Sequence, residues 1–135
     1  MERLMYLIDT NIFLEGLLEQ EKAESVRYFF QAVDIEKTFM TDLALHSIGI
    51  ILFRLKKYEL FTSFVEDMII NGMEILSSTP EDLMKLDRTV QQYNLDFDDA
   101  YQYMLAEKHQ LQLISFDKDF DSTKIGRKEP SEIVQ

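Results

Sequence analysis

The sequence of 135 residues contains no cysteine, which excludes disulfide bridges and thiolate metal sites and is compatible with a reducing compartment. No apolar run approaches the roughly 20 residues that are needed to span a bilayer. No basic segment followed by an apolar stretch and a cleavage site marks a signal peptide. We therefore expect a soluble, cytoplasmic protein that has no membrane partner.

Histidine and glycine are also scarce, with two and four residues respectively. Two histidines argue against a His-based metal site or catalytic triad, and we interpret His46, inside an apolar segment, as a core residue. The scattered glycines form no phosphate-binding loop, and no nucleophile elbow of a serine hydrolase is present. Carboxylates remain as the candidate catalytic or metal-binding side chains.

Acidic residues dominate the charge, with 25 acids against 14 bases and a formal net charge of −11. A field of that sign repels nucleic acid and gives no long-range attraction to phosphates. A solvated acidic surface explains this charge, but several acids are also candidates for one cation-binding pocket. These candidates are Asp9, Asp42, Asp98, Asp99, Asp117 and Asp119.

The apolar pattern predicts strands that alternate with helices. Short apolar runs indicate strands at 4–9, 38–40, 73–76 and 111–115, and the first of these lacks alternation, as in a strand buried on both faces. Helical patterns cover 11–18, 21–33, 42–55, 58–70, 79–93 and 96–110, of which 42–55 is apolar nearly all round and is expected to be buried. We expect an edge strand at 123–125 and a loosely ordered tail from about 126. The order predicts one α/β domain, residues 1–135, with a mainly parallel sheet.

Acids lie where the predicted strands end. One apolar run ends at Asp9 and another at Asp117, while Asp98 and Asp99 fall in the first turn of the helix predicted for 96–110. Ligands of open α/β sheets bind beyond the carboxyl ends of the strands. Clustered carboxylates repel one another unless a cation neutralises them, and oxygen ligands suit Mg²⁺ or Mn²⁺. The pattern therefore predicts a metal site capable of phosphodiester hydrolysis.

Each of these acids also has a structural explanation. An Asp in the first helical turn satisfies free backbone N–H groups, which is the preferred interpretation for Asp96 and Asp98 and an equal alternative for Asp99. Asp117 and Asp119 are also typical of turns. The two polar residues after Asp9, Thr10 and Asn11, either start a helix or hold a metal-bound water and orient Asp9.

Three short motifs resemble a known family. They are Leu7-Ile8-Asp9-Thr10-Asn11, the pair Asp99-Ala100, and Leu113-Ile114-Ser115-Phe116-Asp117-Lys118-Asp119-Phe120. In this order and in a chain of this length, they are similar over nearly the whole chain to the PIN domain. That fold is shared by many small metal-dependent ribonucleases, including VapC-type toxins of toxin–antitoxin pairs.

The resemblance implies a three-layer α/β/α fold and a pocket that binds Mg²⁺ or Mn²⁺. By family role, three residues match the acids that hold the metal: Asp9, Asp99 and Asp117. Asn11 matches the polar residue beside the first acid, and Ser115 matches the small polar residue before the last. Asp119 stands where a supplementary acid sometimes occurs.

One family acid is missing from its expected position. The family usually has a Glu on the helix after the second strand, where this chain has His46 or Ser47. Asp42 lies more than one helical turn earlier, about 6 to 7 Å along the axis. It substitutes for the Glu only if that helix starts closer to the pocket.

The leading hypothesis is a metal-dependent endoribonuclease that acts on RNA, with the further expectation of an antitoxin partner and a homodimer. The helix at 58–70 and the pair Phe29-Phe30 could supply a dimer surface, but burial inside the domain is the preferred interpretation of both. The alternative is a non-catalytic PIN-like module that binds protein or RNA. A phosphatase is a weaker third hypothesis, because Asp9-Thr10-Asn11 lacks the second acid of aspartyl-phosphate enzymes.

Overall fold

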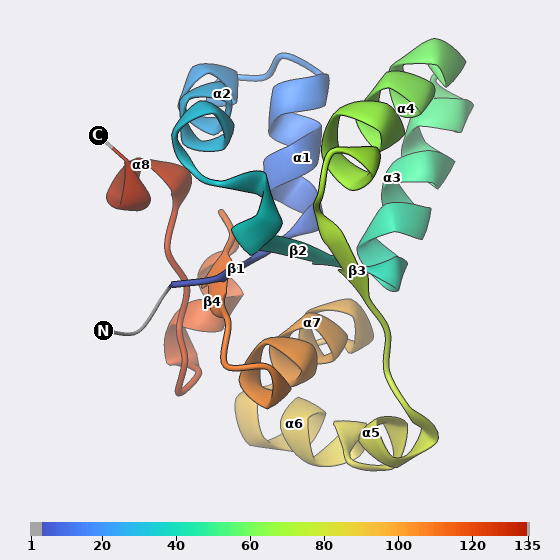
Figure 1. Ribbon diagram of the computed structural model, residues 1–135. Coiled ribbons are helices and arrows are strands. Elements are labelled where there is room, and N and C mark those ends of the chain that lie inside the picture. The colour runs from blue at the N-terminus through green and yellow to red at the C-terminus, as the bar shows by residue number, and fades with distance from the viewer. Residues whose placement is uncertain (1–3, 135) are drawn as a thin grey trace.

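The computed structural model describes residues 4–134, and its centre is a parallel sheet of four strands (Figure 1). The strands are β1 (Tyr6–Ile8), β2 (Thr38–Thr41), β3 (Glu74–Leu76) and β4 (Gln112–Ile114). Their order in the sheet is β3-β2-β1-β4, and every pairing is parallel. The predicted α/β class with a mainly parallel sheet is confirmed.

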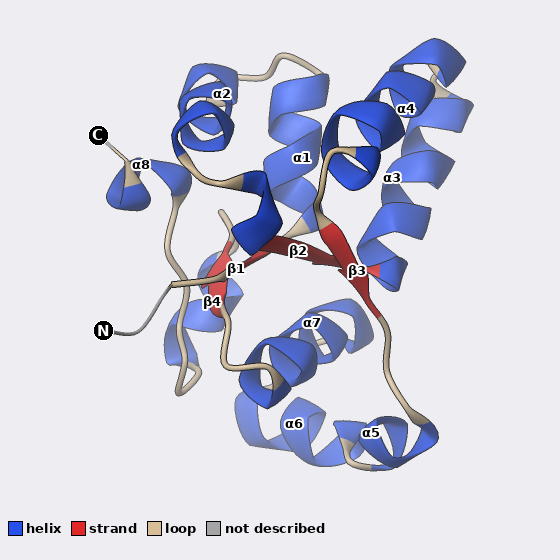
Figure 2. Ribbon diagram, in the orientation of Figure 1, coloured by secondary structure: helices blue, strands red, loops and turns tan. Residues whose placement is uncertain are grey.

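Helices cover both faces of this sheet, as Figure 2 shows. One face carries α1 (Thr10–Leu17), α2 (Ala23–Ala32), α3 (Asp42–Arg54) and α4 (Tyr58–Phe64). The other carries α5 (Pro80–Met84), α6 (Leu86–Tyr93) and α7 (Phe97–Lys108). Short 3₁₀ helices, η1 (Ile35–Lys37) and η3 (Lys118–Ser122), and a C-terminal helix, α8 (Pro130–Ile133), complete the chain. The three-layer arrangement that the family resemblance implies is confirmed.

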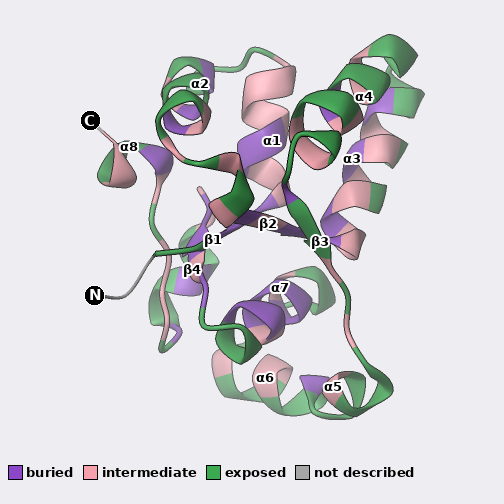
Figure 3. Ribbon diagram, viewed as in Figure 1, coloured by how far each residue is buried: buried purple, intermediate pink, exposed green. Residues whose placement is uncertain are grey.

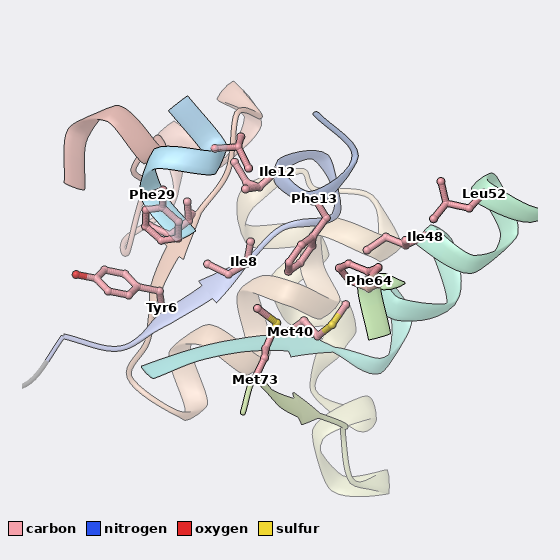
Figure 4. Close-up of a cluster of buried hydrophobic side chains, with 13 residues drawn as sticks. Tyr6, Ile8, Ile12, Phe13, Phe29, Met40, Ile48, Leu52, Phe64 and Met73 are labelled. Atoms are coloured by element: carbon pink, nitrogen blue, oxygen red, sulfur yellow. The ribbon is translucent and has the colours of Figure 1, made fainter. Parts of the chain in front are cut away.

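The strand β1 is apolar throughout because its successive side chains enter two different cores. Tyr6 and Ile8 pack towards α1, α2 and α3, where they meet Phe13 and Phe29 (Figure 4). Leu7 points to the opposite side and joins the cluster beneath α6 and α7. Burial of each such side chain stabilises the fold by about 1.5–3 kcal/mol.

The register places two polar residues side by side beyond the carboxyl ends of β1 and β4. Ile8 pairs with Ile114, and the backbone N–H of Asp9 donates to the carbonyl of Ile114 over 2.9 Å. Asp9 and Ser115 are therefore the first residues beyond the paired strands. Both are buried.

Two predicted helices differ from the observed ones. The helix expected over 79–93 is divided at Lys85, because Leu83 and Met84 remain exposed whereas Leu86 turns onto the core. Its predicted start is confirmed, since Thr79 and Asp82 form a reciprocal capping box with Pro80 at the first helical position. The helix over 58–70 ends in a π-helical segment, Val65–Ile70.

The expectation that α3 is buried on all sides is wrong. Ala44, Ile48 and Leu52 face the core, but Ile50 and Phe53 are each 51% exposed. The helix lies at the margin of its layer against α1 and α4, so only one side is covered (Figure 3). His46 is exposed and is therefore not a core histidine.

The edge strand expected at 123–125 is absent from the described chain. In its place, Lys128 forms a single parallel bridge with Ile114. The Lys128 N–H donates to the carbonyl of Leu113 over 2.9 Å, and its carbonyl accepts from the Ser115 N–H over 3.0 Å. The backbone after Gly126 thus extends the sheet beside β4.

Arg127 ties the segment after Gly126 to the rest of the domain. The guanidinium lies 2.9 Å from Asp121 and 2.8 Å from Glu129, and it donates to the carbonyl of Ser115 over 3.2 Å. The following helix α8 packs against α2. Among residues 4–134, no helix combines the length and apolar character that crossing a membrane requires.

Candidate metal centre

The carboxylate of Asp9 is 5% exposed and accepts two short hydrogen bonds. Ser115 Oγ donates to Oδ2 and Gln102 Nε2 donates to Oδ1, each over 2.6 Å. The donors come from β4 and from α7, so two separate elements fix the plane of this carboxylate. These two bonds leave acceptor sites of the carboxylate for further partners.

The hydroxyl of Ser115 connects the ends of β1 and β4. It donates to Asp9 and accepts from Asn11 Nδ2 over 3.3 Å and from the Asp117 N–H over 2.9 Å. Its one proton and two lone pairs are therefore all used. Asn11 Oδ1 accepts from the Phe116 N–H over 3.2 Å, which ties α1 to the loop after β4. Asn11 thus orients Asp9 through Ser115, and it does not cap α1.

A group of three carboxylates lies at the same end of the sheet. Asp99, Asp117 and Asp119 each offer an oxygen, and these oxygens all lie within 4.8 Å of one another. Asp117 also accepts from the Asp119 N–H over 2.9 Å, so it begins the 3₁₀ helix η3 as well as joining the group. The turn interpretation and the pocket interpretation of Asp117 are therefore compatible.

Helix α7 brings Asp99 to this group. Asp96 is the N-cap and accepts from the Asp99 N–H over 3.0 Å, as the capping interpretation of Asp96 predicts. Since Asp96 fills the capping role, the half-buried carboxylate of Asp99 is left to face the other acids. Asp98 is exposed and its side chain forms no hydrogen bond with residues 4–134.

Burial raises the pKa of both Asp9 and Asp99. For Asp9 the hydrogen bonds from Ser115 and Gln102 oppose this effect without cancelling it. For Asp99 the negative charges of Asp96, Asp117, Asp9 and Asp119 add to burial and raise the pKa to about 8. Without a cation, Asp99 therefore holds a proton at neutral pH.

The three grouped carboxylates fit a small divalent cation. Ligands on opposite sides of one Mg²⁺ lie about 4 Å apart, so oxygens within 4.8 Å need only small side-chain adjustments. All-oxygen donors are those that Mg²⁺ and Mn²⁺ prefer. Asp9 is outside this group in the described chain, although its charge contributes to the raised pKa of Asp99.

Neither Asp42, considered as a substitute for the missing Glu, nor Ser47, near the expected position of that Glu, belongs to this group. Asp42 begins α3 and accepts from the Tyr101 hydroxyl and from the Leu43 N–H, each over 2.8 Å. Tyr101 in turn accepts from the Ser78 N–H over 3.1 Å. The half-buried Ser47 has no side-chain hydrogen bond within residues 4–134. Asp42 therefore holds Tyr101 in place and is not one of the grouped carboxylates.

Thr10 occupies the first position of α1, directly after Asp9. Its backbone hydrogen bond to Asp9 lowers the pKa of that carboxyl, against the effect of burial. Its hydroxyl makes no hydrogen bond with the described residues, so its contribution to the site is through the backbone.

Gln102 is the residue that sequence reasoning missed. It is 4% exposed and lies three positions after Asp99 on α7, so both side chains lie on one face of the helix. Its carbonyl oxygen Oε1 is buried and has no hydrogen-bond partner among the described residues. In the sequence, Gln102 stands among apolar helix residues and resembles an ordinary core position. The signal that could have identified it as a site residue is its spacing of three from Asp99.

The fold is shared with several solved structures. A toxin–antitoxin complex from Klebsiella pneumoniae matches with a TM-score of 0.73 and 19% identity, over 93% of this chain and 97% of the other. FitAcB from Neisseria gonorrhoeae matches with a TM-score of 0.72 and 15% identity, over 94% and 99%. Mycobacterium tuberculosis VapC20, described as a Sarcin-Ricin loop cleaving toxin, matches with a TM-score of 0.73 and 12% identity, over 92% and 97%.

At these identities the structural likeness concerns the fold. No curated protein sequence matches the chain significantly. The family model described as PIN domain, in contrast, matches residues 6–126, which include all the acids of the candidate metal centre. This chain belongs to the PIN domain family.

Proposed function

We propose that this protein is a metal-dependent endoribonuclease. The observation that carries the proposal is the group formed by Asp99, Asp117 and Asp119 beside the buried, doubly hydrogen-bonded Asp9. Four carboxylates at one end of a sheet are costly without a cation, as the raised pKa of Asp99 indicates. Membership of the PIN domain family supports a nuclease.

The residues have distinct roles in this proposal. Asp99, Asp117 and Asp119 would hold Mg²⁺ or Mn²⁺, and Asp9 would complete the site through its remaining lone pairs. When bound, the ion supplies an activated water and neutralises the charge that develops on the phosphodiester. Ser115 and Gln102 keep Asp9 in one orientation, so that this geometry exists before RNA binds.

We further propose that the nuclease is the toxin of a toxin–antitoxin pair and acts in the cytoplasm. The neighbours from Klebsiella pneumoniae and Mycobacterium tuberculosis are named as a toxin–antitoxin complex and as a toxin, and the fold is shared over nearly the full length of each chain. An antitoxin is the expected protein partner.

A homodimer is also proposed. Its support is the exposed apolar side of α3 and the start of α4, where Ile50, Phe53, Leu55 and Tyr58 are each 51% exposed. Phe29 does not contribute to such a surface, because it is fully buried, as the preferred interpretation of the sequence predicts. Sedimentation of the wild type and of Phe53→Ser tests this, since a dimer through this face should dissociate in the variant.

Cleavage of RNA in Mg²⁺ or Mn²⁺ tests the function. The wild type should cut RNA, and Asp9→Asn and Asp99→Asn should each reduce the rate strongly while the fold persists. Asp87→Asn, an exposed acid on α6 outside the group, is the matched control and should retain full activity. Undiminished cleavage by Asp9→Asn would refute the proposal.

A non-catalytic PIN-like module that binds protein or RNA is the second candidate. It is favoured by the engagement of Asp42 with Tyr101 and by the presence of His46 or Ser47 where the family usually has a Glu, so that no acid of α3 joins the described group. Calorimetric titration with Mn²⁺ separates the two candidates. Tight binding that Asp99→Asn abolishes supports the enzyme, whereas no binding supports the module.

A further inference from the structure

A polar cleft adjoins the three grouped carboxylates. It has a volume of about 600 Å³ and lies between the end of α6 and the 3₁₀ helix η3. It is lined by Gln92, Tyr93, Asn94, Lys118, Asp119 and Ser122. Because Asp119 belongs both to this lining and to the carboxylate group, the cleft opens directly beside the candidate metal centre.

The lining offers hydrogen-bonding groups that the described chain does not use. The exposed amides of Gln92 and Asn94 form no side-chain hydrogen bond with residues 4–134, and the exposed ammonium of Lys118 forms no ion pair there. Some cations of the chain are paired, such as Lys108 with Asp82 at 2.8 Å and Arg127 with Asp121 at 2.9 Å, whereas Lys118 and several other surface cations within residues 4–134 are not. Lys118 differs from the other unpaired cations in its place, because it lines the cleft together with Asp119.

The local backbone keeps these groups facing the cleft region. Asn94 ends α6 in the left-handed conformation, with φ of 54°, so the chain turns away and leaves its side chain at the helix end. Lys118 is the first residue of η3, directly after the capping Asp117. Tyr93 stacks on the buried Tyr103, with ring centroids 5.0 Å apart. This contact holds the ring of Tyr93 in place in the cleft lining.

These groups match the chemistry of a nucleotide. An ammonium binds a phosphate oxygen, and a side-chain amide both donates to and accepts from the edge of an unpaired base. The volume of the cleft falls within the about 300–1,000 Å³ that is typical of small-ligand sites. The adjoining carboxylates offer no hydrogen-bond donor. Contacts to the phosphates and bases of a strand would therefore come from the cleft.

We propose that this cleft is a nucleotide subsite that binds RNA next to the scissile phosphate. Lys118 contacts a backbone phosphate, and Gln92 and Asn94 contact the neighbouring base. The inference rests on the proposed ribonuclease function, because it takes RNA as the ligand. It assigns strand binding to residues outside the carboxylate group.

Binding of a short fluorescein-labelled single-stranded RNA tests the subsite, measured by anisotropy in Mg²⁺ with Asp99→Asn as the background to suppress cleavage. Lys118→Gln should weaken binding by roughly two- to five-fold. It should also reduce the slope of log affinity against log salt by about 0.7, the value for one phosphate contact on a single strand. Gln92→Ala should weaken binding by roughly three- to ten-fold without changing that slope.

Two matched controls accompany these variants. Lys124→Gln removes another exposed lysine, and Gln91→Ala removes the exposed glutamine that precedes Gln92. Neither Lys124 nor Gln91 lines the cleft. Neither should change affinity or slope. Thermal unfolding of Lys118→Gln in this background should match that of Asp99→Asn alone, and Mn²⁺ titration of Lys118→Gln with Asp99 intact should match the wild type, so that a loss of RNA affinity is not a loss of the fold or of metal.

The outcomes separate the subsite from the nuclease function. Cleavage by the wild type together with unchanged RNA binding in Lys118→Gln and Gln92→Ala overturns the subsite and leaves the ribonuclease intact. No cleavage, with the predicted losses of binding, refutes the ribonuclease and supports the subsite. RNA binding that the controls weaken equally, or no RNA binding at all, overturns the subsite.

Discussion

Gln102 on α7 donates a hydrogen bond of 2.6 Å to the carboxylate of Asp9, 93 residues earlier at the end of β1. The bond joins the helix that carries Asp99 to the strand that carries Asp9, and it is buried. Its geometry also fixes the amide orientation, since the reversed amide would place an oxygen against the carboxylate. The Gln102 carbonyl oxygen is left without a partner as a consequence.

Replacement of Gln102 by leucine should reduce Mn²⁺ affinity and RNA cleavage by about 10–100-fold, the usual effect of removing a group that orients a ligand. The change in stability should be small, because the variant also removes an unpartnered buried oxygen. Calorimetry and chemical denaturation measure the two effects separately. Gln91→Leu, an exposed glutamine on α6, is the control; equal metal affinity in both variants would exclude a role for Gln102.

Stability should fall as pH rises when no metal is present, and this pH dependence should reverse when metal binds. Burial and neighbouring acids raise the folded-state pKa of Asp99 from 3.8 to about 8, and the pKa of Asp9 is raised in the same direction. Between these values the folded chain binds more protons than the unfolded chain, so stability falls as pH rises from about 4 to 8.

Thermal unfolding in a chelator should therefore show a melting temperature that decreases over this pH window. Adding Mn²⁺ should raise the melting temperature most at the alkaline end, where the carboxylates bind metal without first losing a proton. Asp99→Asn should flatten both dependences. A melting temperature that is insensitive to Mn²⁺ at pH 8 would contradict this electrostatic description.

Removal of the Ser115 hydroxyl should destabilise the protein by about 1–3 kcal/mol, because Asp9 loses a donor and Asn11 and the Asp117 N–H lose an acceptor. Denaturant unfolding of Ser115→Ala measures the loss. Ser63→Ala alters an exposed serine without hydrogen bonds in the described chain, and it should change stability by less than about 0.5 kcal/mol. Similar values for the two variants would show that the hydroxyl network is unimportant.

The Arg127 guanidinium should anchor the segment up to α8. Arg127→Gln breaks the ion pairs with Asp121 and Glu129 and the bond to the Ser115 carbonyl. Faster hydrogen exchange at Lys128 and in α8 is expected, with little change in α3. Arg88→Gln, which alters an exposed arginine on α6, serves as the control and should leave exchange unchanged.

Sequence patterns predicted those features that depend on local periodicity. The unbroken apolar run before Asp9 indicated a strand buried on both faces, and Thr79-Pro80 indicated a helix start, as the capping box shows. The positions of Ile50 and Phe53 were misinterpreted, because periodicity records which residues are apolar and not whether a neighbouring element covers them.

Features that depend on contacts between distant segments were not predictable in this way. Gln102 contacts Asp9 only because α7 crosses the end of β1, and Lys128 pairs with Ile114 only because Arg127 holds the chain there. The engagement of Asp42 with Tyr101 likewise joins residues 59 positions apart. No local pattern signals such pairs.

The most direct measurement is a crystal structure of the wild-type protein with Mn²⁺, located by its anomalous scattering. The metal-site proposal predicts Mn²⁺ bound by Asp99, Asp117 and Asp119, next to the hydrogen-bonded Asp9. Crystals of Asp99→Asn should lack that peak. A peak elsewhere on the chain, or none at a Mn²⁺ concentration that supports RNA cleavage, would contradict the assignment of these carboxylates as the metal centre.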